Sequence, residues 1–99
     1  MARWVTSKSS LLDFISLVVV YAPNEFPQED YLSPEEQLTL TMAFDELRFG
    51  LESFLRSTCD PQVFTQLESL LERSLQHYEQ GRDVEGAHVL QDFEAIAFP

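Results

Sequence analysis

The chain of 99 residues has few cysteines, few basic residues and no long apolar run. Cys59 is its single cysteine, so no intrachain disulfide can form and nothing indicates an oxidising compartment. The apolar run over residues 11–20 is interrupted by Asp13 and is far shorter than the roughly 20 apolar residues that span a membrane. The sequence also contains no catalytic motif, metal-binding motif or internal repeat. Its function must therefore be inferred from shape and charge.

A secretion signal is the one targeting segment that the N-terminus suggests. Arg3 and Lys8 precede the apolar run, and residues 20–22 (Val-Tyr-Ala) loosely resemble a cleavage site. Asp13 within the run and Pro23 directly after the supposed cleavage site both argue against this interpretation. We therefore expect a cytoplasmic protein.

Basic residues are scarce relative to acidic ones. Six Lys and Arg residues stand against 17 Asp and Glu residues, which gives a net charge of -11 and a pI near 4.3. Residues 1–24 carry a balance of +1, residues 25–52 one of -7 and residues 53–99 one of -5. A field of this sign repels phosphate backbones and anionic lipid surfaces and attracts basic proteins. We expect a basic protein partner, with no direct nucleic-acid or membrane binding.

The length and the 44% hydrophobic content predict one domain with a real core. Residues 1–8 are expected to form a loose arm that can fold back onto the body, and residues 9–99 a single helical domain. The first helix is expected from Ser9 or Ser10, either of which can cap it, to Ala22. The β-branched residues 18–20 would also suit a strand. Helix is favoured because no other segment offers such a strand a partner.

Three further helices follow from capping signals. Ser33 and Pro34, with Glu36 completing a capping box, predict a long helix from about Pro34 to Ser57. Its expected apolar seam consists of Leu40, Phe44, Leu47, Leu51 and Phe54. Asp60 followed by Pro61 begins the third helix, which Gly81 ends, and Asp83 is expected to cap the fourth. The sequence thus predicts an all-α, four-helix bundle-like domain with short loops and an acidic connection between the first two helices.

No combination of reactive side chains indicates an enzyme. His88 and Asp92 are four residues apart and could supply two metal ligands, but no third ligand is evident. Cys59 directly precedes a helix start, but no neighbouring histidine is implied that could activate it as a nucleophile. His77 lies near the expected end of the third helix. We expect no catalysis, no metal and no cofactor.

The segment from Glu25 to Gln37 is the most unusual part of the chain. It places five carboxylates around three large apolar side chains, those of Phe26, Tyr31 and Leu32. Phe26 and Leu32 either attach this segment to the core or face a partner, and the sequence leaves both possibilities open. Tyr31 is the best candidate for an exposed anchor, because tyrosine is favoured at binding hot spots.

Three stretches of the chain resemble a known family. These are residues 26–32 (FPQEDYL), 43–48 (AFDELR) and 86–94 (GAHVLQDFE), and they resemble small acidic immunity proteins of bacterial contact-dependent growth-inhibition and related polymorphic toxin systems. The resemblance implies a cytoplasmic protein that binds one cognate toxin domain, often a basic nuclease, and covers its active site or substrate surface. It implies no catalytic residues, and it does not identify the toxin.

A toxin-facing surface can be predicted from this resemblance and the charge pattern. The predicted surface consists of Glu25, Glu29, Asp30, Tyr31, Glu35, Glu36, Asp45, Glu46 and Glu52. Helix capping already accounts for Glu35 and Glu36, so the hypothesis depends most on residues 25–31. Two other classes remain open: an adaptor that binds a basic transcription or signalling protein, and a phage-type nucleic-acid mimic that inhibits a defence enzyme. The oligomeric state is also left open.

Overall fold

The computed structural model describes residues 4–22, 26 and 33–98, and within them it consists of helices without strands. The main helices are α1 (Lys8–Tyr21), α2 (Leu40–Gly50), α3 (Pro61–Glu79) and α4 (Asp83–Ala97). A 3₁₀ turn, η1 (Pro34–Glu36), precedes α2, and a π-helix, η2 (Leu51–Leu55), continues it. The predicted all-α fold is confirmed.

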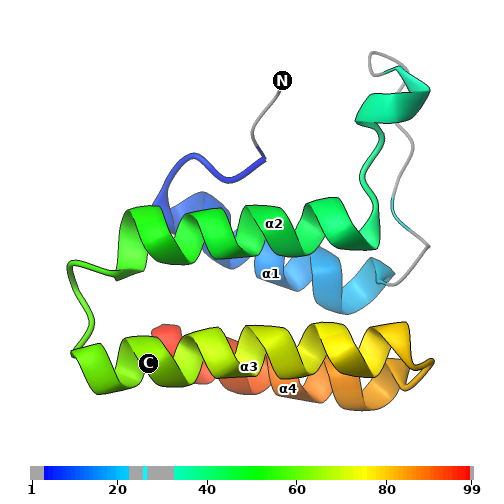
Figure 1. Ribbon diagram of the computed structural model, residues 1–99. Helices are drawn as coiled ribbons and strands as arrows, with labels where there is room; N and C mark the ends of the chain where they lie inside the picture. The colour runs from blue at the N-terminus through cyan, green and yellow to red at the C-terminus, as the bar shows by residue number, and fades with distance from the viewer. Residues whose placement is uncertain (1–3, 23–25, 27–32, 99) are drawn as a thin grey trace.

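The four helices form an antiparallel bundle in two layers. Figure 1 shows α1 and α2 in one layer and α3 and α4 in the other. The α3–α4 hairpin has the largest interface, and α1 packs on both α2 and α4. The Cα radius of gyration of 13.1 Å matches the roughly 13 Å expected for a compact domain of about 100 residues. Consecutive helices are neighbours; the connections on either side of α3 are short, whereas residues 22–39 separate α1 from α2.

Helix α1 is helical over its full length, including the β-branched residues that would have suited a strand. Its buried side chains are Leu11, Phe14, Ile15 and Val18. Ser7, and not Ser9 or Ser10, is the N-cap: its Oγ accepts a hydrogen bond from Ser10 N (3.1 Å), and Ser7 N donates to Ser10 Oγ (2.8 Å). This reciprocal capping box satisfies two backbone groups at once, which favours a start two or three residues earlier than predicted.

The second helix begins later than the sequence predicts, and this expectation was wrong. Residues 34–36 form a single 3₁₀ turn, and α2 starts at Leu40 with Thr39 as its N-cap, whose Oγ1 accepts from Met42 N at 3.3 Å. Between the two elements the side chain of Leu38 is buried in the core. The Ser-Pro-Glu-Glu signal therefore starts a local turn, and the chain then bends to bury Leu38 before the long helix begins.

The end of that helix also departs from a regular pattern. Arg56 N donates to the carbonyl of Leu51, five residues earlier, at 3.1 Å, which is π-helical geometry. Leu55 is fully buried, whereas Phe54 of the predicted seam is only half-buried and packs edge-to-face on Phe49, with ring centroids 6.2 Å apart. The rest of the seam is confirmed, apart from Leu40, which is half-buried.

Helix α3 begins and ends where its signals predict. Asp60 Oδ1 accepts from Gln62 N at 2.9 Å. After the last turn, Gly81 has a φ of +79°, Gly81 N donates to Tyr78 O, and Arg82 N donates to His77 O. These two bonds form a Schellman motif, in which glycine is favoured at the left-handed position.

Helix α4 packs against α3 at a very short distance. Ser74 is fully buried on α3, and its Oγ donates to the carbonyl of Gly86 on α4 at 2.7 Å. A Cβ at Gly86 would lie 2.9 Å from two carbons of the Tyr78 ring, so only glycine fits without displacement. Asp83 is the first residue of α4 and not its cap. The positive end of the helix dipole favours a negative charge at this position.

Candidate functional site

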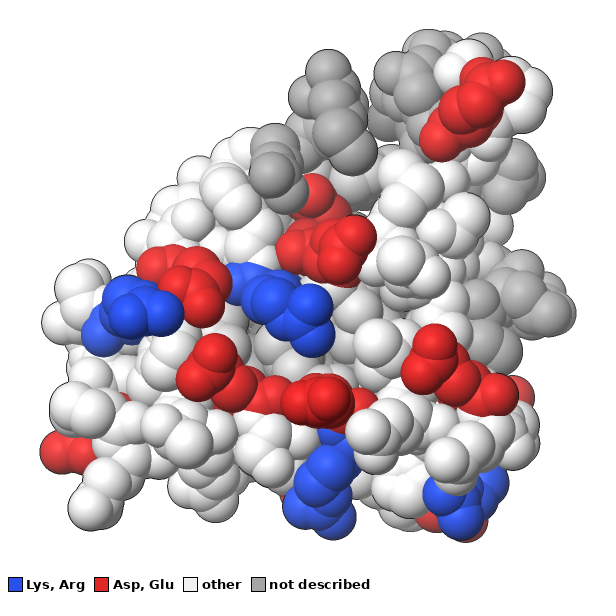
Figure 2. Space-filling view, viewed as in Figure 1, with Lys and Arg blue, Asp and Glu red and all other residues white. Residues whose placement is uncertain are grey.

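An acidic face extends across α2, η2 and α3. We define it by five exposed carboxylates: Asp45, Glu52, Glu68, Glu72 and Glu79. Glu68, Glu72 and Glu79 follow one another at intervals of four and seven residues, so they form one stripe along α3. Figure 2 shows acidic side chains gathered over α2 and α3 on this side of the molecule. The bundle packing thus brings carboxylates from distant parts of the chain onto one surface.

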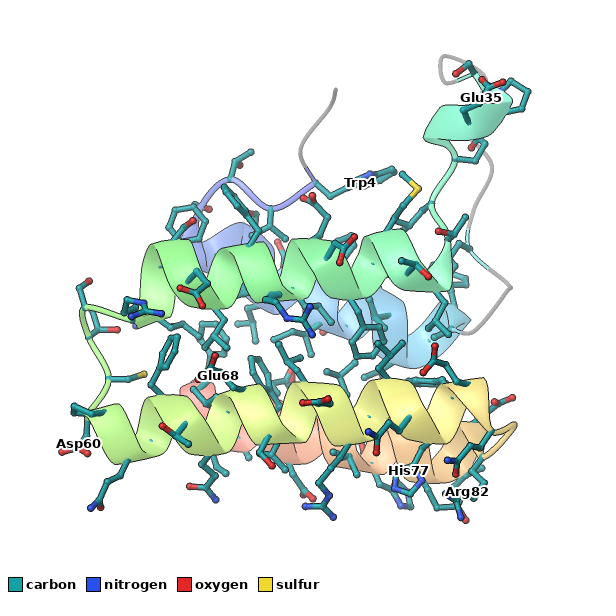
Figure 3. The ribbon with its side chains drawn as sticks, viewed as in Figure 1. Trp4, Glu35, Asp60, Glu68, His77 and Arg82 are labelled. Atoms are coloured by element: carbon teal, nitrogen blue, oxygen red, sulfur yellow. The ribbon has the colours of Figure 1, made fainter. Side chains whose placement is uncertain are left out.

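The side chain of Glu68, the first residue of the α3 stripe, shows which way the stripe faces. Figure 3 shows Glu68 directed toward α2, whereas His77 and Arg82 point away from α2. The opposite side of α3 is taken up by α4, because Ser74 and Tyr78 meet Gly86 there. The stripe therefore borders the line along which α2 and α3 pack.

Two exposed arginines belong to the same part of the chain: Arg48 on α2 and Arg56 directly after η2. Arg56 Nε and Nη2 both donate to Glu52 Oε2, at 3.0 and 2.7 Å, and the Arg56 guanidinium lies 4.6 Å from the centre of the Phe64 ring. With five carboxylates and two guanidinium groups, the face has a formal balance of -3. It is therefore a mixed surface with an acidic excess, which attracts cations but also requires a matching pattern from its partner.

A hollow of about 330 Å³ lies at the end of this face, where η2 turns into α3. It is lined by Arg56, Cys59, Pro61, Phe64, Thr65 and Glu68. Phe64 supplies an almost completely buried ring, and Thr65 Oγ1 donates to Pro61 O at 3.0 Å within the first turn of α3. The hollow thus combines an aromatic wall with one carboxylate and one ion-paired guanidinium.

Glu46 does not belong to the exposed surface on which it was predicted. Only 5% of it is exposed, and its Oε1 accepts hydrogen bonds from Trp4 N (2.9 Å) and Val5 N (3.1 Å). Val5 is completely buried, and the Trp4 ring packs on Phe14 with centroids 6.2 Å apart. Glu46 therefore holds residues 4 and 5 against the bundle, and this part of the expected loose arm is packed.

The other predicted site residues have different outcomes. Glu25, Glu29, Asp30 and Tyr31, as well as the side chain of Glu36, lie outside the part of the chain that the structure describes. Asp45 and Glu52 are exposed and belong to the acidic face, and their contact with a toxin stays a prediction.

Glu35 and Phe26 belong to the segment that the sequence singled out. Glu35 is exposed on η1, and Figure 3 shows it well separated from Glu68. It is therefore not brought together with the α3 stripe. Phe26 is buried in the core, so its role is to attach this segment to the body.

The sequence prediction missed the acidic stripe on α3. Its signal was the spacing of Glu68, Glu72 and Glu79, which places all three on one side of a helix. Without the packing of α2 on α3, however, nothing indicated that this stripe adjoins Asp45 and Glu52.

Among the residues that the structure describes, Tyr78 has the one strongly shifted pKa. Burial of the phenol, together with the negative charge of Asp83, raises the pKa of Tyr78 to about 12. Its hydroxyl has no hydrogen-bond partner among the described residues, and its ring packs against Phe44 at 6.0 Å. Tyr78 lies near the other end of α3 from the hollow, and the packing of its ring indicates a core residue.

The residues considered for metal binding or catalysis do not assemble into a site. His88 and Asp92 are both exposed on α4, and Cys59 is half-buried beside the hollow. Within residues 4–22, 26 and 33–98, no group of three or more His, Cys, Asp or Glu side chains could hold a metal ion. None of the helices in the same part of the chain is both long and apolar enough to cross a membrane.

Comparisons with known proteins returned nothing: no family model, curated protein or solved structure matches the chain. The resemblance to immunity proteins therefore stays a prediction.

Proposed function

We propose that this chain is a non-enzymatic, cytoplasmic binding protein that neutralises a basic partner, and specifically that it is an immunity protein for a cognate toxin domain. The acidic face on α2, η2 and α3 covers the active site or the substrate-binding surface of that toxin. The observation that carries the proposal is the gathering of exposed acidic side chains over α2 and α3 on one side of the molecule (Figure 2).

The charge of this surface supports a nuclease as the partner. A nuclease holds its substrate through cationic side chains that contact phosphates, and it therefore presents a basic surface. Carboxylates on a rigid helix pair compete for the same cations and cannot be cleaved. Charges of opposite sign also accelerate association, which benefits an inhibitor that must capture a toxin before it acts.

The test is co-expression with the basic C-terminal domain of a large toxin encoded directly upstream of this chain's gene. The unaltered chain should restore growth and bind the domain with an affinity that falls as salt increases. The charge-reversed variant Asp45→Lys/Glu72→Lys/Glu79→Lys should bind roughly ten- to a hundredfold more weakly, because three attractive contacts become repulsive. Isothermal titration calorimetry at two salt concentrations measures both effects.

The matched control reverses charge on another helix. Glu85→Lys/Asp92→Lys changes two exposed carboxylates on α4 without altering the acidic face. This variant should keep most of the affinity and the growth rescue. A second variant, Glu29→Lys/Asp30→Lys/Glu35→Lys, tests the segment that the sequence favoured. If neither the triple variant on the acidic face nor the variant at residues 29, 30 and 35 weakens binding more than the α4 control does, the proposed surface is wrong. If no basic toxin domain binds, the proposed function is wrong.

A further inference from the structure

The hollow between η2 and α3 has a volume of about 330 Å³ and includes the aromatic ring of Phe64 in its lining. We propose that it receives the cationic end of one lysine or arginine side chain of the basic partner, and so fixes the register of the complex. This inference rests on the proposed function and names the contact at which the partner is held.

The charges around the hollow favour a cation. Glu68 lines it and makes no ion pair with the residues that the structure describes. The one guanidinium of the lining, that of Arg56, is compensated by the carboxylate of Glu52, so the carboxylate of Glu68 leaves a local balance of -1. Asp60, at the same end of α3 in Figure 3, caps the helix by accepting from Gln62 N.

Arg56 does not make the hollow an anion site. Its Nε and Nη2 both donate to Glu52 Oε2, so its charge is compensated within the protein. The same guanidinium lies over one face of Phe64, which shows that this ring accepts a cation. An incoming cation would therefore meet the carboxylate of Glu68 beside an Arg56 charge that is already compensated.

The size and the lining fit one side chain. A volume of about 330 Å³ is at the lower end of the roughly 300–1,000 Å³ typical of ligand pockets, too small for a folded segment of a partner. Pro61, which is exposed, and the small exposed part of the Phe64 ring offer apolar surface for the methylene stem of a lysine or arginine, while Glu68 can meet the charged end. Long basic side chains favour such sites because the stem is buried and the charge stays near the surface.

The test uses three probes and the full-length ¹⁵N-labelled chain. N-acetyl-lysine methylamide and N-acetyl-arginine methylamide should shift the amide resonances of Cys59, Phe64, Thr65 and Glu68 more than those around Glu72 and Glu79. N-acetyl-glutamate methylamide should leave them unchanged. Glu68→Gln should weaken this response at least about threefold, whereas Glu72→Gln, one turn further along the same stripe, should not. Both residues are exposed, so both variants should fold.

A second measurement uses Cys59 as a reporter. Because Cys59 lines the hollow, the capped cations should slow its alkylation by iodoacetamide, and Cys59→Ser provides the blank. Equal shifts over all exposed acids, or shifts produced by the glutamate probe, would overturn the inference. A peptide of ten lysines separates the two proposals. If it binds while the capped cations leave the hollow unchanged, only the inference fails; if it does not bind at all, the electrostatic basis of the proposed function fails too.

Discussion

Replacing Glu46 with alanine should destabilise the fold by about 2–4 kcal/mol, because two backbone amides lose their acceptor. Val5 is completely buried, so its N–H cannot be reached by water, and an unsatisfied buried donor costs about 1–3 kcal/mol. Trp4 is half-buried, so its N–H recovers part of its loss through solvent. Glu46→Gln keeps a carbonyl oxygen as acceptor and should cost less than half as much.

Urea unfolding followed by circular dichroism measures this cost, and the emission of Trp4, the single tryptophan, reports whether residues 4 and 5 stay packed. Release of the segment should shift that emission to longer wavelength. The matched control is Glu52→Ala, whose exposed i,i+4 pair with Arg56 contributes only about 0.3–0.5 kcal/mol.

Equal unfolding midpoints for Glu46→Ala and Glu52→Ala, with unchanged Trp4 emission, would refute the structural role of Glu46. Glu46→Gln separates folding from binding. It should leave the affinity for a basic partner unchanged, because the Glu46 carboxylate already bonds to the protein's own backbone.

Two further predictions concern the α3–α4 contact. Gly86→Ala should lower the urea midpoint of unfolding. Overpacking of the new methyl group against the Tyr78 ring costs about 1–3 kcal/mol, which exceeds the roughly 1 kcal/mol that alanine gains over glycine in a helix. An unchanged midpoint would mean that the ring has room to move. Absorbance at 295 nm should show Tyr78 ionising near pH 12, a step that Tyr78→Phe removes. Because the pKa is higher in the folded state than its ordinary value of 10.0, stability should fall as pH rises from about 10 to about 12, and a flat profile in that window would contradict the burial of the phenol.

Much of the fold could be predicted because its signals are local. The Asp60-Pro61 start and the Gly81 stop of α3 depend on backbone groups within a few residues, and both are as predicted. The helical state of α1 follows from the spacing of Leu11, Ile15 and Val18, although the β-branched residues 18–20 would suit a strand. Periodicity and capping are properties of a single segment, so the sequence displays them directly.

The errors arise where a distant segment competes with a local signal. The Ser33-Pro34 start yields only a 3₁₀ turn, because the core takes Leu38 and Thr39 then caps a new helix. Ser74 is polar yet fully buried, because Gly86 brings a carbonyl within 2.7 Å of its hydroxyl. Neither outcome can be inferred from the residues next to these positions.

The candidate site divides in the same way. The sequence by itself determined that the chain is strongly acidic and that Asp45 and Glu52 lie on the outer side of a helix, since charge and helical phase are read from composition and spacing. Only the tertiary structure decided that Glu46 turns inward to the amides of residues 4 and 5, and that the carboxylates of α3 join those of α2. A carboxylate is hydrated wherever water reaches it. The packing of helices that are far apart in the chain decides which carboxylates stay accessible to water.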